Sequence, residues 1–311
     1  MTKELEIIPL IFSVDDNYAP FLGVALKSIF DNASKNYNYK VYVLNTSLSS
    51  ENKRKLQEIC KDSASLEFVD VKEKIKELNK ELHVRDYYTD AIYYRLFIPS
   101  IFTNYDKALY LDCDIVAVDD VSKLYNEELN DNYLAGVSDE VVAFEEIFSE
   151  YSEKGLDVKR ENYFNSGIIL MNLKEFRRIN LDEIFSNLLN KFKFEVAPDQ
   201  DYLNVICKDK TKYLHLGWNK APMNNPSFND KDLKIIHYKL AGKPWLYDDV
   251  LYGEYFWEYA KKTPYYLDIL NIKNNYSEEN KLKDLEGYEK LKNMAKNYLL
   301  STNNYKRSKE L

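Results

Sequence analysis

The chain contains 311 residues, which corresponds to one large domain or two modest ones, and 45% of them are hydrophobic, enough for a sizeable core. Asp and Glu outnumber Lys and Arg by 51 to 43, and the net charge of −8 disfavours a nucleic-acid partner, because such partners require a basic face. Only 8 glycines are present and no GxGxxG motif occurs, which excludes a dinucleotide-binding dehydrogenase in practice.

Short, apolar, β-branched runs in the first quarter of the chain predict buried strands, at residues 7–14, 40–44 and 66–69. Between them, apolar residues recur at helical spacing over 21–30 and again after Ser49, which is placed to cap the second helix. Strands that alternate with helices in this way predict a parallel α/β sheet with crossover helices.

The alternation continues through the rest of the chain. Residues 90–98 predict a helix, and further strands are predicted at 107–111, 166–173 and 233–237. The acidic stretch 139–162 has an irregular pattern and predicts a mobile loop with some helical content. After about Tyr252, aromatic residues crowd together and Lys- and Asn-rich helical sequence follows. We therefore predict a catalytic domain over residues 1–252 and a small helical extension over 253–311.

The cysteines and the N-terminus bear on the cellular compartment. Cys60, Cys113 and Cys207 form no CxxC pair, and such a sparse, odd set is typical of reduced thiols in the cytosol. The N-terminal segment carries acids where a signal peptide has only bases, and no stretch approaches the ~18 apolar residues of a membrane span. These features predict a cytoplasmic protein.

Two carboxylates stand where the apolar run at 107–111 ends, in the sequence LYLDCDIVAVDD. Asp112 and Asp114 lie at the carboxyl end of a predicted strand, where open α/β sheets bind their ligands. Two neighbouring carboxylates repel each other unless a cation or a proton neutralises them, and hard oxygen ligands suit Mg²⁺ or Mn²⁺. A divalent ion there would clamp a diphosphate. A strand end with two solvated acids is the alternative.

A second motif, IIHYKLAGKPW, occupies residues 235–245. His237 ends a predicted strand, and an imidazole there can complete a metal site begun by carboxylates. Lys243 follows six residues later and can pair with a phosphate. A lone histidine is more often structural, so the pairing with Asp112 and Asp114 is what favours a ligand role.

Three further segments are less specific. In FSVDDNYA, residues 12–19, Asp15 could accept a hydrogen bond from a base and Tyr18 could stack on it, but an Asx turn that caps the next helix is the simpler interpretation. The segments YFNSGIILMNL, residues 163–173, and PDQD, residues 198–201, place amides or acids beside apolar sequence.

Together and in this order, these segments resemble the retaining glycosyltransferases of family eight, the group that includes bacterial lipooligosaccharide galactosyltransferases and glycogenin. The resemblance covers about residues 7–245 and is strongest in YLDCDIVAV, YFNSGIILMNL and HYKLAGKPW. It implies the GT-A fold, a mixed and mostly parallel sheet flanked by helices. It also implies a metal-dependent transfer of glucose or galactose from UDP-glucose or UDP-galactose to a glycan, lipid-linked or protein-linked acceptor, as in bacterial cell-surface polysaccharide synthesis.

The resemblance implies a role for each matching position. The metal, usually Mn²⁺, would be held by Asp112, Asp114 and His237. The nucleotide-binding positions would be Ser13, Asp15, Asn17 and Tyr18 for uridine, Arg95 for the donor and Lys243 for the diphosphate. The positions around the hexose would be Asp139, Asn165, Asp199 and Gln200.

One position departs from the family pattern. The family often has glycine three residues after the metal histidine, where this chain has Leu240, with glycine at 242. The spacing from His237 to the lysine is kept. Retention by double displacement would need a carboxylate under the anomeric carbon, whereas the matched residue, Gln200, is a poor nucleophile. This favours front-face substitution, with Asp199 as the residue to check for a covalent intermediate.

Two other functions remain open from the sequence. The Asp-x-Asp-x-Val pattern at Asp112 also fits a haloacid-dehalogenase-type phosphatase, although that motif normally lies near the start of a chain. A non-catalytic sugar-nucleotide-binding protein is the other alternative. The segment from residue 281 onward carries eight Lys or Arg against four Asp or Glu. This favours either peripheral contact with the inner membrane face or a packed helical tail with solvated lysines.

Overall fold

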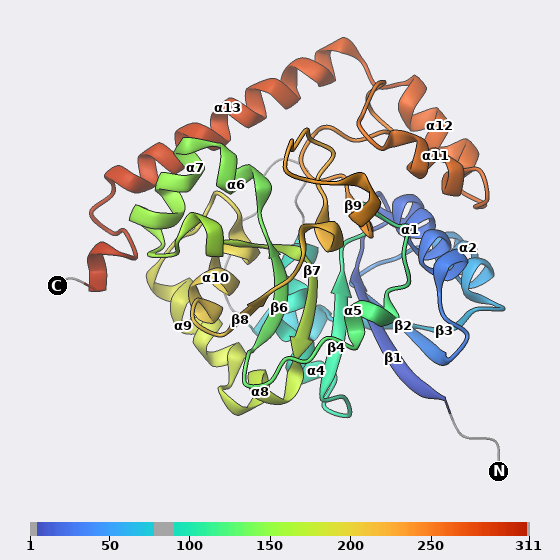
Figure 1. Cartoon of the computed structure of the whole chain (residues 1–311), viewed down its shortest axis with the longest axis horizontal. Helices are drawn as coiled ribbons and strands as arrows, with labels where there is room; N and C mark the ends of the chain where they lie inside the picture. Colours follow the sequence, from blue (N-terminus) through green and yellow to red (C-terminus); the bar gives the residue numbers. More distant parts are fainter. Residues whose placement is uncertain (1–4, 78–89, 310–311) are drawn as a thin grey trace. The chain divides into compact units, whose positions relative to one another are not determined.

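The computed structural model of the protein describes residues 5–77 and 90–309 (Figure 1). The contacts divide the chain into two compact units, each built from three separate segments. The first unit comprises Met1–Glu73, Lys107–Glu128 and His215–Tyr276, and the second comprises Lys74–Asp106, Leu129–Leu214 and Ser277–Leu311. The boundary predicted at residue 252, between a catalytic domain and a helical extension, stays a prediction.

The first unit is built on a parallel sheet. Its strands are β1 (Glu6–Ser13), β2 (Tyr37–Asn45), β3 (Ala64–Asp70) and β4 (Lys107–Leu111), in the order β3-β2-β1-β4. The middle of β1 is fully buried, as its unbroken apolar sequence requires for a central parallel strand. The predicted strands and their parallel pairing are confirmed; β2 and β3 extend beyond their predicted ranges at both ends, β1 is shifted by one residue, and β4 matches its predicted range.

Helices of the first unit connect these strands and follow them. They are α1 (Ala19–Asn32), α2 (Ser50–Cys60), α5 (Ser122–Tyr125), α11 (Gly253–Ala260) and α12 (Tyr266–Asn274), with short 3₁₀ turns η4 (Leu216–Asn219) and η5 (Asp230–Asp232). Ser49 caps α2 as predicted, because its side chain accepts a hydrogen bond from Asn52 N. At Gly23 in α1, a Cβ would lie 2.6 Å from the ring of Tyr265, so glycine permits this close packing.

A separate antiparallel pair completes the first unit. Strand β5 (Ile115–Ala117) pairs with β9 (Ile235–His237), and its register places Ile115 opposite His237. The sequence indicated β9 but not β5.

The second unit contains the strands β6 (Leu134–Ser138), β7 (Phe164–Asn172) and β8 (Thr211–Tyr213) in the order β7-β6-β8. The β6–β7 pair is antiparallel and the β6–β8 pair is parallel, so the strands of the protein are mixed and mostly parallel, as predicted. The helices that belong wholly to it are α4 (Ile98–Ile101), α6 (Glu140–Phe144), α7 (Glu146–Glu150), α8 (Leu173–Arg178), α9 (Leu181–Lys191), α10 (Pro198–Cys207) and α13 (Glu278–Leu300). Helix α3 (Lys72–Glu77) begins in the first unit and ends in the second.

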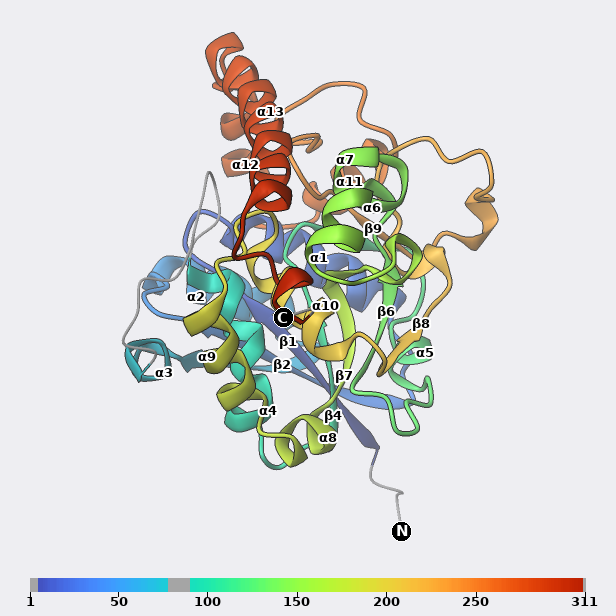
Figure 2. The ribbon, with the colours of Figure 1, turned by 90° about the vertical axis from the view of Figure 1, so that its left-hand side faces the viewer.

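The acidic segment 139–162 is not the irregular loop that its pattern suggested. It forms α6 and α7, which Figure 2 labels, and then the π-helix η2 (Tyr151–Gly155) and the 3₁₀ turn η3 (Arg160–Asn162). The Arg160 guanidinium lies 2.9 Å from Glu153 and 3.0 Å from Glu146, so the charges of the segment pair within it. Phe148 and Tyr151 are buried. The helical content predicted for this segment is therefore confirmed, and it is larger than the pattern indicated because these short helices bury apolar residues without a sustained period.

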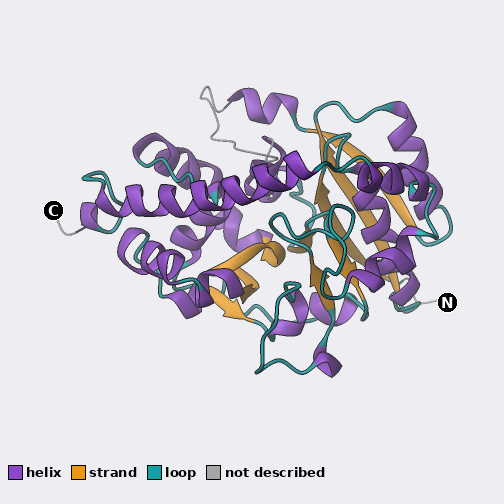
Figure 3. Ribbon diagram, turned by 90° about the horizontal axis from the view of Figure 1, so that it is seen from above, coloured by secondary structure: helices purple, strands orange, loops and turns teal. Residues whose placement is uncertain are grey.

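Helix α13 is the longest helix of the structure and packs against α7 and η2 (Figures 1 and 3). Leu291 and Ala295 are buried in this contact. Leu282 and Leu285, in the first half of the helix, are 60% and 66% exposed. Within residues 5–77 and 90–309, no helix has the length and apolar character needed to cross a membrane.

Candidate functional site

Three candidate metal ligands converge in the first unit. Asp112 and Asp114 follow β4, and His237 ends β9. The Nε2 atom of His237 lies 3.2 Å from Asp114 Oδ1 and 3.8 Å from Asp112 Oδ2. In the described part of the chain, this is the one group of three or more His, Cys, Asp or Glu whose ligand atoms lie within 4.8 Å of one another. We call it the metal cluster; two carboxylates and one imidazole form a donor set that fits Mn²⁺ or Mg²⁺.

The orientation of His237 is fixed by a residue that the sequence did not indicate. Its Nδ1 atom lies 2.9 Å from Oδ1 of Asn219, which is buried at the end of η4. Because an amide oxygen only accepts, Nδ1 is the donor in this contact, and Nε2 is the ring nitrogen that faces the carboxylates. Backbone bonds between Lys220 and β9 bring Asn219 into place. No sequence motif could reveal the contact between Asn219 and His237, because it depends on an isolated β-bridge between Lys220 and Ile236, outside the regular strands.

Gly217 makes that arrangement possible. A Cβ at this position would lie 1.9 Å from the backbone oxygen of Asp232, far inside any real contact. The backbone oxygen of Gly217 also accepts from Lys234 N, which leads into β9. The turn that carries Asn219 therefore approaches the segment before His237 as closely as only glycine permits.

Lys243 lies in the same cluster. Its Nζ atom is 2.7 Å from Asp114 Oδ2 and also donates to the backbone oxygen of Tyr238. Burial alone would raise the pKa of the Asp114 carboxyl, but Lys243 and His237 outweigh burial and hold that pKa well below its ordinary value. Asp114 is therefore ionised at neutral pH, which is the form that binds a metal.

The predicted uridine loop begins at the end of β1. Asp15 Oδ1 accepts a hydrogen bond from Tyr18 N, three residues later, at 3.0 Å, so Asp15 does bind the loop backbone locally; the N-cap of α1 is Tyr18, however, and has no side-chain capping bond. Asn17 is exposed. The Oγ atom of Ser13 is buried without a hydrogen-bond partner among the described residues, and Cys113 Sγ donates to the Ser13 carbonyl. Ser13 thus lies beside the metal cluster with an unused hydroxyl.

Leu240 stands where the family often has glycine, and its backbone conformation is unusual for leucine. Leu240 has a φ of 61°, the left-handed conformation that glycine adopts freely and leucine does not. Gly242 needs no such freedom, since its φ is not positive and a Cβ there would meet nothing within 4 Å. The left-handed residue of this turn is therefore Leu240, at the position where the family often has glycine. Leucine adopts this conformation at a cost in conformational energy.

The predicted hexose-binding residues meet in the second unit. Asn165 Nδ2 donates to Asp139 Oδ2 at 2.9 Å and to Gln200 Oε1 at 3.0 Å, and the Ser166 N–H donates to the same Gln200 oxygen at 2.9 Å. We call these four residues the amide cluster. The backbone donor fixes the orientation of the Gln200 amide.

Asp199 and Arg95 form a buried ion pair beside the amide cluster. Arg95 Nε lies 3.0 Å from Asp199 Oδ2, and Arg95 Nη1 donates to the backbone and side-chain oxygens of Ser166. The Ser166 hydroxyl in turn donates to Asp199. Ser166 therefore contacts Arg95, Asp199 and Gln200; the sequence motif contained it, but no chemical pattern singled it out.

Asp201, the residue after Gln200, was also missed. It is fully buried, and its carboxyl accepts from Tyr163 Oη at 2.6 Å, Tyr151 Oη at 2.8 Å and Ala197 N at 2.9 Å. Burial raises the pKa of Asp201 to about 7, although these three donors oppose the shift. The PDQD motif could not show that its two acids would have such different partners.

Comparisons with known proteins identify the family to which the chain is similar. Residues 9–249 match the family described as Glycosyl transferase family 8. The chain is 27% identical to the lipopolysaccharide 1,2-glucosyltransferase of Escherichia coli K12, over 77% of this chain and 73% of that protein.

Two solved structures are similar to most of the chain. One is galactosyltransferase LgtC in complex with donor and acceptor sugar analogs, with a TM-score of 0.70, 27% identity, and coverage of 83% of this chain and 96% of that one. The other is the bifunctional glycosyltransferase WbbM, with a TM-score of 0.76 and 29% identity. The match covers 88% of this chain but only 53% of WbbM.

Proposed function

Because this chain belongs to glycosyltransferase family 8, we propose that it transfers glucose or galactose from a UDP-sugar to a glycan, lipid-linked or protein-linked acceptor in a metal-dependent reaction. It is a glycosyltransferase with the α/β GT-A fold, and the phosphatase alternative is therefore wrong. The observation that carries the finer proposal is the convergence of Asp112, Asp114 and His237 on one point in the first unit.

The metal cluster would hold Mn²⁺ or Mg²⁺. Such an ion neutralises negative charge that develops on a departing diphosphate. Lys243 lies 2.7 Å from Asp114 and would supply a second cation for the same phosphates. Ser13, Asp15, Asn17 and Tyr18 are the proposed uridine contacts, supported by the unused Ser13 hydroxyl beside the cluster.

The amide cluster and Asp199 are proposed to bind the hexose. Gln200 offers an amide rather than a carboxylate, and Asp199 is neutralised by Arg95 at 3.0 Å, so neither is an activated nucleophile. We propose front-face substitution with retention. The bond from the anomeric carbon to the diphosphate oxygen breaks, the acceptor oxygen bonds to the same face, and the departing phosphate takes the acceptor's proton.

Lipid-linked acceptors at the inner membrane face are the proposed acceptor class. An Escherichia coli relative is a lipopolysaccharide glucosyltransferase. In the second unit, a cavity of about 640 Å³ combines apolar side chains with a basic rim; its lining residues are Ile147, Glu150, Lys154, Lys296, Leu299, Leu300, Lys306 and Arg307. Each basic residue near an anionic leaflet contributes about 1 kcal/mol of attraction.

Vesicle flotation tests the membrane contact. Truncation before α13 would remove its packing against η2, so point substitutions are the better probe. Lys296→Glu combined with Arg307→Glu should abolish flotation with anionic liposomes at low salt. Lys283→Glu combined with Lys290→Glu, two exposed lysines of α13 that do not line the cavity, serves as the charge-matched control and should reduce flotation less. If the unaltered chain stays in solution at low salt, the tail is only structural.

Donor turnover tests the proposed activity itself. Purified protein with Mn²⁺ should release UDP from UDP-glucose or UDP-galactose, faster with a glycan acceptor, and EDTA should stop it. A protein that binds UDP-sugar but never releases UDP in a screen of donors and acceptors would be a binding protein instead.

A further inference from the structure

The second unit contains a buried group of hydrogen-bonded side chains to which no donor-binding role has been assigned. It consists of Tyr151, Tyr163 and Asp201, which we call the tyrosine–carboxylate triad. All three side chains are at most 2% exposed. Two phenol hydroxyls and one backbone N–H converge on a carboxylate that forms no ion pair with any residue the structure describes.

The triad fixes helix α10 from one side. Asp201 follows Gln200 directly, and Ala197 N, just before α10, donates to the same carboxylate. Tyr151 belongs to η2 and Tyr163 immediately precedes β7, so the triad joins three elements. The strand carries Asn165 and the helix carries Gln200, the two residues whose amides meet at 3.0 Å.

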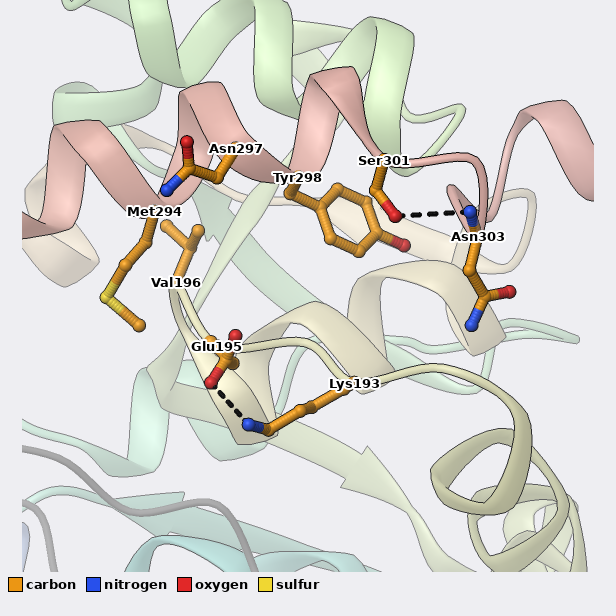
Figure 4. A pocket seen from close by; sticks show the side chains of 8 residues that line it. All are labelled: Lys193, Glu195, Val196, Met294, Asn297, Tyr298, Ser301 and Asn303. Atoms are coloured by element: carbon orange, nitrogen blue, oxygen red, sulfur yellow. Dashed lines mark hydrogen bonds and ion pairs between the residues drawn. The ribbon is translucent and has the colours of Figure 1, made fainter.

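The triad also connects to α13. The ring of Tyr298 lies edge-on to that of Tyr151, with 5.3 Å between ring centroids. Gly155, in η2, permits the approach, since a Cβ there would already lie 3.2 Å from the Tyr298 ring. Figure 4 shows Tyr298 lining a cavity of about 290 Å³ together with Val196, which precedes the start of α10. The η2 segment is a π-helix, a rare conformation that occurs frequently at functional sites.

We propose that the tyrosine–carboxylate triad is a positioning device that sets Gln200 within the amide cluster, and that α13 holds the device in place through Tyr298. This inference rests on the proposed role of Gln200 at the hexose. Misplacing a reacting group by about 1 Å can slow a reaction by about 100-fold, so the hydroxyls of the triad affect turnover without touching the donor.

Tyr151→Phe is the direct test, because it removes one hydroxyl and keeps the ring. In the full-length chain we expect kcat for transfer to fall between about tenfold and 100-fold. The KM for the UDP-sugar and the affinity for UDP with Mn²⁺ should stay within about twofold, since the residues proposed to hold the uridine, the diphosphate and the metal lie in the first unit. Tyr163→Phe should behave in the same way and provides a second variant if the first does not fold.

Tyr202→Phe is the matched control. Tyr202 lies on α10, next to Asp201, and is as fully buried as Tyr151. Its hydroxyl donates to Phe192 O at 2.8 Å rather than to Asp201. We expect its thermal stability to fall as much as that of Tyr151→Phe while its kcat stays within about twofold. Equal loss of kcat in both variants, or no loss in Tyr151→Phe, would overturn the proposal.

Tyr298 tests the contribution of α13. Tyr298→Phe keeps the ring and should retain kcat, whereas Tyr298→Leu should lower it, and combining Tyr298→Leu with Tyr151→Phe should give less than the product of the two effects. Gln200→Ala distinguishes a failure of the proposed role of Gln200 from a failure of the positioning device. If Gln200→Ala transfers normally, the proposed role of Gln200 fails; if it is impaired and the triad variants are not, only the positioning device fails.

Discussion

Ile115 and His237 face each other across the antiparallel β5–β9 pair, so the histidine lies beside the residue that follows Asp114. The two halves of the metal cluster are more than a hundred positions apart in the sequence, and this three-residue pairing brings them together. Any change that shifts the register by one residue would turn the imidazole to the opposite face.

Removal of any ligand of the metal cluster should nearly abolish transfer. Asp112→Asn and Asp114→Asn are expected to reduce the rate by several orders of magnitude, and His237→Ala nearly as much, because the metal loses a ligand. Calorimetric titration with Mn²⁺ should show the same loss of binding. Asp119→Asn, an acid of the same segment that pairs with Lys123, is the control and should bind metal normally. Full activity in excess EDTA would exclude a metal role.

Asn219→Ala should weaken Mn²⁺ binding by about tenfold to 100-fold without removing a ligand, because His237 loses the partner that orients its ring. Asn219→Asp should keep much of the affinity, since a carboxylate also accepts from Nδ1. The measurement is Mn²⁺ binding by electron paramagnetic resonance. Equal affinities in the alanine variant and the unaltered protein would show that β9 alone orients the imidazole.

Transfer should retain the anomeric configuration. An α-linked donor is expected to give an α-linked product, which NMR of the isolated product determines. A β-linked product would contradict the front-face mechanism, and a sugar covalently attached to Asp199 in a trapped reaction would replace it with double displacement.

The left-handed backbone at Leu240 predicts an unusual order of stabilities. Leu240→Gly and Leu240→Ala both remove the side chain, but only glycine relieves the conformational cost at a φ of 61°. The glycine variant should therefore be more stable than the alanine variant by about 1 kcal/mol in urea unfolding. The order expected in an ordinary loop is the reverse, because glycine gains more freedom on unfolding.

Asp201 should make the protein less stable as the pH rises. Its pKa is about 7 in the folded protein and about 3.9 in an unfolded chain, so between these values the folded state binds more protons. The contribution of Asp201 to the free energy of unfolding is therefore full below about pH 4 and declines up to about pH 7. Asp201→Asn should remove this decline, measured as the difference between the two proteins in urea unfolding at pH 4.5 and 7.5.

The sequence predicted the parallel strands of the first unit well, because their apolar runs are long and end in clear turn residues. It also singled out Asp112, Asp114 and His237, whose ligand atoms the structure brings within 4.8 Å of one another, and their role as metal ligands stays a prediction. It missed β5, which at three residues is too short to show any period. It missed Asn219, Ser166 and Asp201 as well, because their roles depend on which partners the folded chain brings to them.

The interleaving of the two units has a consequence for synthesis on the ribosome. His215–Tyr276 supplies His237 and Asn219 to the first unit, so a nascent chain that ends before this segment cannot form the metal cluster. Ser277–Leu311 belongs to the second unit, so that unit is incomplete until α13 has left the exit tunnel. Domains usually fold one after another during translation, but here both units must wait for the last third of the polypeptide. Their apolar surfaces consequently stay exposed for longer, and chaperone dependence during expression is the expected result.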